Sequence, residues 1–252
     1  MNWTIRSEQG FAYIEEGEGE LILLLHGLFG ALSNWEHVLA QFSPHYKVVI
    51  PLIPIYEMPL RQANLAGLVQ FITGFIQLKK FESFTLVGNS LGGHVGLIYT
   101  LQHPAQVRRL VLTGSSGLYE NTMGGSFIKR GDYGYIAERV RYTFYDPQVA
   151  TPAYIDEVFD IVQDRNKAIR ILSIAKSAQR HNMAHELPRI QTATLLIWGL
   201  NDTITPPLVA HEFNTLLPNS QLRFMDRCCH APMMEHPAKF NHILGQFLKA
   251  TA

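Results

Sequence analysis

Residues 84–94 read Phe-Thr-Leu-Val-Gly-Asn-Ser-Leu-Gly-Gly-His and form the most informative segment of the sequence. An apolar run enters a Gly-x-Ser-x-Gly turn centred on Ser90, and a helix-period stretch follows from Leu91. Glycines at both flanks suit a sharp strand-to-helix turn, because a side chain there would crowd the neighbouring strand and helix. Ser90 would also lie at a helix N-terminus, where the dipole favours developing negative charge. The pattern therefore predicts Ser90 as an exposed nucleophile.

Short apolar runs recur on both sides of this stretch, at residues 21–25, 48–53, 84–87, 110–112, 195–198 and 222–225. Because the runs are continuous rather than alternating, they predict strands buried on both faces, as in a mostly parallel sheet. Helix-period stretches lie between them, at residues 35–42, 62–78, 91–102, 207–217 and 237–248. This alternation predicts a doubly wound α/β fold.

The alternation breaks between residues 118 and 187, which hold helix patterns at 133–145, 152–162 and 168–180. We therefore expect an α/β core of residues 1–117 and 188–252 and a helical cap, or lid, of residues 118–187. The insertion follows a strand, so it can cover the carboxyl ends of the strands, where open α/β sheets bind ligands. Thr151-Pro152 and Thr205-Pro206 each predict a capping hydroxyl before a first-turn proline.

A serine nucleophile needs a base and an orienting acid, expected after later strands in the order Ser, acid, His. Asp202 follows the run at 195–198, and His230 follows the run at 222–225. We therefore predict a triad of Ser90, Asp202 and His230. Asp226 is a rival acid, and two more distant rivals lie in the insertion, Asp160 and Asp164.

The loop after the first buried run, residues 26–30, is expected to help form an oxyanion hole. The predicted donors are the backbone N–H groups of Leu91 and Leu28, with Phe29 as the alternative to Leu28. His26 is expected to fix this loop by hydrogen bonds. Bulky side chains suggest an apolar pocket, although they could equally pack the cap onto the core; the candidates are Phe29, Tyr119, Met123 and Phe127.

Composition excludes several other classes of function. The 252 residues are 47% hydrophobic and 17% charged, which suits a sizeable core rather than a disordered chain. Lys+Arg and Asp+Glu both number 21, so no basic excess points to nucleic acid or an anionic membrane surface. No apolar run approaches a membrane span, and the N-terminus does not read as a signal peptide. The expected partner is a small-molecule substrate, and the chain is expected to be a monomer or homodimer.

Metal and cofactor motifs are likewise not expected. His181 and His185 have helical i, i+4 spacing, but the glutamate that completes a zinc-protease motif is replaced by Asn182. Residues 17–20, Gly-Glu-Gly-Glu, precede a strand instead of following one, so they do not predict a dinucleotide site. The only cysteines, Cys228 and Cys229, are adjacent and give no disulfide framework, which fits a cytoplasmic location.

These residues together resemble the α/β-hydrolase superfamily over nearly the whole chain. The matching motifs are His26-Gly27-Leu28-Phe29-Gly30, Gly88-Asn89-Ser90-Leu91-Gly92-Gly93, Trp198-Gly199-Leu200-Asn201-Asp202, and His230-Ala231-Pro232 with Glu235 and Pro237. Two branches look similar: the carbon–carbon hydrolases of meta-cleavage products and the small carboxylesterases with their perhydrolase and haloperoxidase-like relatives. The resemblance implies a serine hydrolase without a metal or organic cofactor.

Two departures from the family pattern bear on the substrate. Relatives usually place an Asp and a Pro-Gly-x-Gly turn after the fourth strand, whereas residues 51–59 here are apolar and lack glycine. The carbon–carbon hydrolases also carry an arginine that binds a substrate carboxylate, and no motif selects one among Arg139, Arg141, Arg170 and Arg180. The leading expectation is therefore ester hydrolysis (EC 3.1.1 rather than 3.7.1). The alternatives are a carbon–carbon hydrolase and a non-catalytic small-molecule binding module.

Overall fold

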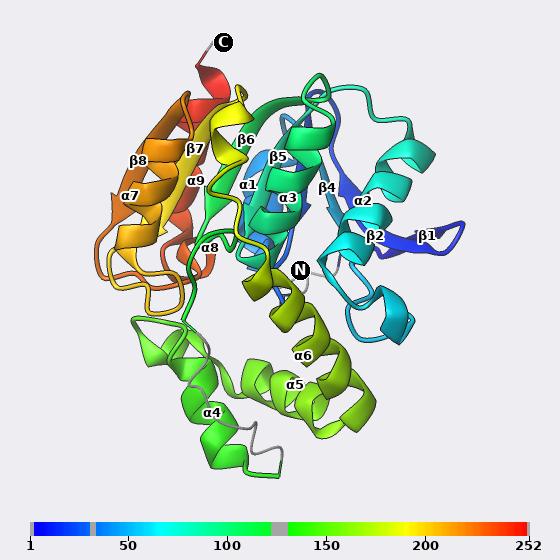
Figure 1. Cartoon of the computed structure of the whole chain (residues 1–252), viewed down its shortest axis with the longest axis vertical. Helices are drawn as coiled ribbons and strands as arrows, with labels where there is room; N and C mark the ends of the chain where they lie inside the picture. Colours follow the sequence, from blue (N-terminus) through cyan, green and yellow to red (C-terminus); the bar gives the residue numbers. More distant parts are fainter. Residues whose placement is uncertain (1–2, 31–33, 122–130, 251–252) are drawn as a thin grey trace.

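The computed structural model describes residues 3–30, 34–121 and 131–250. In these residues the strands form one eight-stranded sheet in the order β1-β2-β4-β3-β5-β6-β7-β8. The parallel strands are β3 (Leu21–Leu25), β4 (Lys47–Pro51), β5 (Phe84–Asn89), β6 (Val107–Thr113), β7 (Ala193–Gly199) and β8 (Ser220–Met225). The doubly wound, mostly parallel fold is therefore confirmed (Figure 1).

Two further strands were not anticipated from the sequence. β1 (Arg6–Glu8) and β2 (Phe11–Glu16) form an antiparallel hairpin, and β2 pairs with β4 in the antiparallel sense. They extend the edge of the sheet away from Ser90, so they support the core without entering the site (Figure 1).

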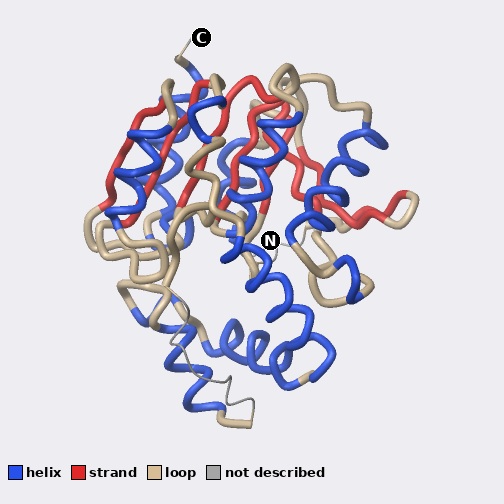
Figure 2. The backbone as a smooth tube through the Cα atoms, in the orientation of Figure 1, coloured by secondary structure: helices blue, strands red, loops and turns tan. Residues whose placement is uncertain are grey.

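Helices cover both faces of the sheet, as Figures 1 and 2 show. One face carries α2 (Leu65–Lys79), α3 (Leu91–Gln102) and α7 (Pro207–Leu216); the other carries α1 (Glu36–Phe42), α8 (Pro232–Glu235) and α9 (Pro237–Lys249). Strand β3 explains the continuous apolar run: Leu21, Leu23 and Leu25 pack into the cluster beneath α2 and α3, and the residues between them pack into the opposite cluster. Every residue of β3 is buried, as expected for a strand covered on two sides.

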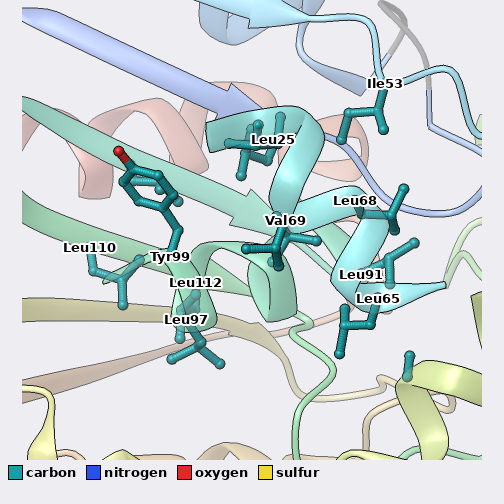
Figure 3. Packing of buried hydrophobic residues seen from close by; sticks show 14 of the residues in the cluster. Leu25, Ile53, Leu65, Leu68, Val69, Leu91, Leu97, Tyr99, Leu110 and Leu112 are labelled. Carbon is teal, nitrogen blue, oxygen red and sulfur yellow. The ribbon is translucent and has the colours of Figure 1, made fainter. Parts of the chain in front are cut away.

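The cluster on the α2 and α3 face reaches the turn that carries Ser90. Leu91, the first residue of α3, packs in the same cluster as Leu65 and Leu68 of α2, as Figure 3 shows. The start of α3 is therefore held by core packing, and Ser90 lies immediately before it.

Residues 118–187 hold the helices expected there, apart from 122–130, which lie outside the described residues. The helices are α4 (Tyr133–Arg141), α5 (Pro152–Gln163) and α6 (Arg165–Arg180), with a short 3₁₀ turn, η3 (Pro147–Val149), between α4 and α5. They lie beyond one end of the strands in Figure 1. We call residues 131–187 the cap segment; its role as a lid stays a prediction.

The two proline-linked caps have different outcomes. Thr151 caps α5, because its side chain accepts from the Tyr154 N–H at 3.2 Å, as predicted. The prediction for Thr205 is wrong: α7 begins after Pro206, and the Thr205 hydroxyl donates instead to Asp202 Oδ2 at 2.8 Å. Because α7 starts one residue later than predicted, Pro206 takes the N-cap position and Thr205 belongs to the Asp202 loop instead.

Candidate active site

Ser90 occupies the strained turn that its flanking glycines predict. Its backbone has φ +53° and ψ −121°, a region that non-glycine residues rarely adopt. The Ser90 N–H donates to the Thr113 carbonyl at 3.1 Å, and the Ser90 carbonyl accepts from the Ser116 N–H at 3.1 Å. The chain after β6 therefore holds the turn in place by two hydrogen bonds.

The glycines around Ser90 are required by close approach of backbone. A Cβ at Gly88 would lie 2.6 Å from the Gly92 carbonyl oxygen, and a Cβ at Gly92 would overlap the Leu25 carbonyl. A Cβ at Gly27 would lie 3.2 Å from the Ser90 Cβ. The loop after β3 is thus packed directly against the serine.

Asp202 and His230 meet beside this turn. His230 Nδ1 lies 3.0 Å from Asp202 Oδ2 and 3.2 Å from Oδ1. Asp202 is 3% exposed and also accepts from the N–H groups of Ile204 and Thr205, both at 2.9 Å, and from the Thr205 hydroxyl. These hydrogen bonds hold the buried carboxylate in one orientation.

Asp202 determines both which nitrogen of His230 carries the proton and how basic the imidazole is. Burial disfavours the imidazolium, but the charge and the hydrogen bond of Asp202 outweigh it, so the pKa of His230 is raised. An ionised Asp202 accepts the Nδ1–H, which leaves Nε2 as the basic nitrogen. This is the tautomer that a general base in a triad requires.

The structure brings His230 next to the Ser90 turn, but among the described residues the His230 imidazole and the Ser90 hydroxyl form no hydrogen bond. Asn89 Nδ2 donates to the carbonyls of both Thr113 (3.0 Å) and His230 (3.2 Å). A Cβ at Gly114 would lie 2.9 Å from His230 Nδ1, so the imidazole packs against the residue after β6. Hydrogen bonds between catalytic groups are often long before substrate binds.

The rival acids lie elsewhere. Asp226 is exposed in the turn after β8, and Asp160 is exposed on α5. Asp164 caps α6 by accepting from the N–H groups of Asn166 and Lys167. His230 pairs with Asp202, so the geometry favours Asp202 as the acid.

The loop after β3 is fixed by His26, as expected. The buried imidazole donates from Nδ1 to the Gly27 carbonyl at 2.9 Å and accepts from the Ile53 N–H at Nε2, 3.1 Å away. Burial lowers the pKa of His26, so the ring stays neutral. Within the described residues the N–H groups of Leu28 and Leu91 donate no hydrogen bond, which leaves both for an oxyanion. The Leu28 carbonyl is meanwhile held by the Tyr56 hydroxyl at 3.1 Å.

The predicted pocket residues are spread over different environments. Phe29 is half-buried between the two core clusters, whereas Tyr119 is 59% exposed and donates to Asn121 Oδ1 at 2.7 Å. Met123 and Phe127 lie outside the described residues. A cavity of ≈ 470 Å³ adjoins the acid, and it is lined by Tyr142, Phe144, Tyr145, Leu200, Asn201, Asp202, Thr203 and Cys229. The pocket assignment stays a prediction.

Sequence reasoning missed two glutamates near His230. Glu120 is half-buried, and its carboxylate accepts from the Ser116 hydroxyl at 2.8 Å. Glu235, noted only as part of a motif, accepts from the N–H groups of Cys229 (2.7 Å) and Tyr145 (2.6 Å). Both could have been found by asking which carboxylates follow a strand end or the histidine, because the carboxyl ends of parallel strands share one edge.

His181 and Arg170, two other residues singled out in the sequence, have partners outside the proposed triad. In the described residues no group of three or more His, Cys, Asp or Glu side chains is placed to hold a metal ion. His181 is exposed at the end of α6, and its Nδ1 lies 3.0 Å from Nε2 of the buried His94 on α3. Arg170 binds the carbonyls of Met58 and Asn166. Within the part of the chain that the structure describes, no helix is both long and apolar enough to span a membrane.

Residues 22–243 match the model of the alpha/beta hydrolase family, so the chain belongs to this family. It is 25% identical to a 2-hydroxy-6-oxo-2,4-heptadienoate hydrolase of Pseudomonas putida, over 93% of this chain and 91% of that protein. It is 24% identical to a monoacylglycerol lipase of Mus musculus, over 92% of this chain and 76% of that protein.

The comparison with solved structures agrees. An alpha/beta hydrolase enzyme from the metagenome of Mar Chica lagoon sediments in Morocco is 40% identical, with a TM-score of 0.80 and 98% of each chain covered. A meta-cleavage product hydrolase of Pseudomonas fluorescens is 20% identical with a TM-score of 0.82, which shows the shared fold.

Proposed function

We propose that the protein is a serine hydrolase that cleaves an ester or related acyl bond of a small, apolar substrate. The observation that carries the proposal is the buried Asp202–His230 pair beside the strained Ser90 turn. An acid, an imidazole of raised pKa and a serine at the start of a helix are the groups that acyl transfer requires.

The proposed mechanism has two halves. His230 Nε2 takes the hydroxyl proton as Ser90 Oγ attacks the carbonyl carbon, while Asp202 stabilises the imidazolium. The N–H groups of Leu28 and Leu91 stabilise the tetrahedral oxyanion, and each such donor contributes about 3 kcal/mol. His230 then protonates the leaving alkoxide, and a water molecule activated by His230 releases the acyl group from Ser90.

The test is labelling with a fluorophosphonate. The serine oxygen bonds to phosphorus and fluoride leaves, so intact mass reports one covalent adduct. We expect an adduct on the wild type and on Ser83→Ala, an exposed serine at the start of β5, and none on Ser90→Ala. The absence of an adduct on folded wild type would favour the binding-module alternative.

A second candidate is hydrolysis of a carbon–carbon bond in a meta-cleavage product. Its support is the similarity to the heptadienoate hydrolase of Pseudomonas putida. Parallel kcat/KM measurements on an aryl ester and on 2-hydroxy-6-oxohepta-2,4-dienoate separate the two. We expect the ester to be preferred; a higher kcat/KM on the dienoate would favour the second candidate.

A further inference from the structure

Glu120 lies in the short segment after β6, which forms hydrogen bonds to both the Ser90 turn and the Asp202 loop. Its carboxylate accepts from the Ser116 hydroxyl, and the N–H of the same serine donates to the Ser90 carbonyl. The next residue, Asn121, donates from its N–H to the Ile204 carbonyl at 2.7 Å and from its side chain to the Thr203 carbonyl at 2.8 Å. Glu120 is thus anchored on both sides at the edge of the sheet where the proposed triad lies.

The charge of Glu120 acts on the same site. Burial raises the pKa of Glu120, and the positive charge of a protonated His230 lowers it. Within the described residues, the charged side chains that raise the pKa of His230 are Asp202, Glu120 and Glu235. Arg170 of the cap segment is instead bound to the Met58 and Asn166 carbonyls.

These charges decide which substrates the site tolerates. Asp202 is buried behind the imidazole and is satisfied by its own loop, whereas Glu120 is half-buried and has one hydrogen bond from Ser116. A carboxylate on the acyl chain of the substrate would bring a second negative charge next to Glu120 in a partly desolvated site. Like charges in such surroundings repel strongly.

We propose that Glu120 is a specificity-determining residue that restricts this site to uncharged esters and excludes substrates whose acyl chain carries a carboxylate. This inference rests on the proposed function and names its substrate class. It separates the chain from the relative named as a 2-hydroxy-6-oxo-2,4-heptadienoate hydrolase, whose substrate carries a carboxylate.

The test compares two esters of equal chain length at pH 8: 4-nitrophenyl pentanoate, which is uncharged, and 4-nitrophenyl hemiglutarate, which ends in a carboxylate. The readout is the ratio of their kcat/KM values, because a general folding defect lowers both alike. Glu120→Gln removes the charge but keeps an oxygen that can accept from Ser116. Glu212→Gln, on the exposed face of α7, removes one negative charge away from the site and is the matched control.

We expect the wild type and Glu212→Gln to favour the pentanoate by about 10-fold, and Glu120→Gln to bring the ratio close to one. Equal rates on both esters in the wild type would overturn the proposal, as would an unchanged ratio in Glu120→Gln. If Glu120→Gln does not fold, Glu120→Ala serves as the second charge-removing variant, and the wild-type ratio alone can overturn the proposal.

Failure of this inference is distinguishable from failure of the proposed function. A fluorophosphonate adduct on Ser90 together with equal rates on the two esters removes the role of Glu120 alone. The absence of both an adduct and turnover of either ester removes the proposed function, and this inference with it.

Discussion

At the scale of single residues, the chemistry of the site depends on whether the His230 imidazole is protonated. His230 is buried, and burial alone would keep its pKa low, yet Asp202 raises the pKa by charge and by a hydrogen bond. Below this pKa the imidazole is protonated and cannot accept the proton of Ser90. We therefore expect kcat/KM on an aryl ester to fall as the pH drops, with a midpoint above about 6.5, the ordinary value for histidine.

Removing the charge of Asp202 tests the same pair. Asp202→Asn should lower kcat by about 10⁴-fold, because the amide no longer selects the required tautomer, and should move the acid limb to lower pH. Asp226→Asn removes an exposed carboxylate after β8 and should leave both the rate and the midpoint unchanged. The role of Asp202 would be wrong if its variant kept the wild-type pH profile.

The sequence could rank these two acids but could not separate them by spacing. Asp202 and Asp226 each follow a strand, so the chain order admits both. What separates them is loop conformation: the turn at 202–205 directs two backbone N–H groups at Asp202, whereas Asp226 remains in solvent. Those bonds depend on local backbone angles, which residue types constrain only weakly. The same bonds take the Thr205 hydroxyl away from its predicted capping role.

At the scale of elements, the strand–turn–helix around Ser90 requires glycines, because there is no room for a Cβ atom at these positions. A Cβ at Gly92, in the first turn of α3, would lie 2.6 Å from the His26 carbonyl oxygen and closer still to that of Leu25. Gly92→Ala should therefore lower the free energy of unfolding by about 3 kcal/mol and abolish ester hydrolysis. Urea denaturation and an aryl-ester assay measure the two effects.

A second helical glycine supplies the control. A Cβ at Gly245 in α9 would lie 3.7 Å from a ring carbon of Phe42, which is ordinary contact. Gly245→Ala should keep full activity and raise the free energy of unfolding by up to about 1 kcal/mol, because alanine favours the helix. Equal stability of the two variants would contradict the close packing inferred at Gly92.

The elements that the sequence predicted are those buried on two sides. Strands β3 and β5 are buried throughout, and their continuous apolar runs are unmistakable. The hairpin of β1 and β2 escaped prediction because β1 is exposed and has no apolar residue, and because β2 is mostly half-buried and ends in two glutamates. An edge hairpin needs little hydrophobic pattern, since pairing with β4 satisfies one side of β2.

At the scale of the whole molecule, the position of the cap segment relative to the core could not be predicted, because it depends on contacts between residues that are far apart in the sequence. Glu235 of α8 accepts from the Tyr145 N–H in the cap segment and from the Cys229 N–H, next to His230. The His230 N–H itself donates to the Thr143 carbonyl at 3.2 Å. The cap segment and the candidate base are therefore held by one carboxylate and one backbone bond. Another link between the cap segment and the core, which involves neither His230 nor its loop, is the Ser177 hydroxyl of α6, which accepts from the Leu65 N–H of α2 at 3.1 Å.

These two links should separate stability from activity. Glu235→Ala leaves two N–H groups without their acceptor, so we expect the free energy of unfolding to fall by about 2 kcal/mol. Because one of those groups precedes His230, kcat/KM on an aryl ester should fall by about 10-fold or more, and amide exchange at residues 143–146 should quicken. Ser177→Ala breaks the other of these two cap–core links, and its activity should stay within about twofold of the wild type, since the bond touches neither His230 nor its loop. Wild-type activity in Glu235→Ala, or an equal loss in Ser177→Ala, would mean that the cap segment and His230 are not coupled through this carboxylate.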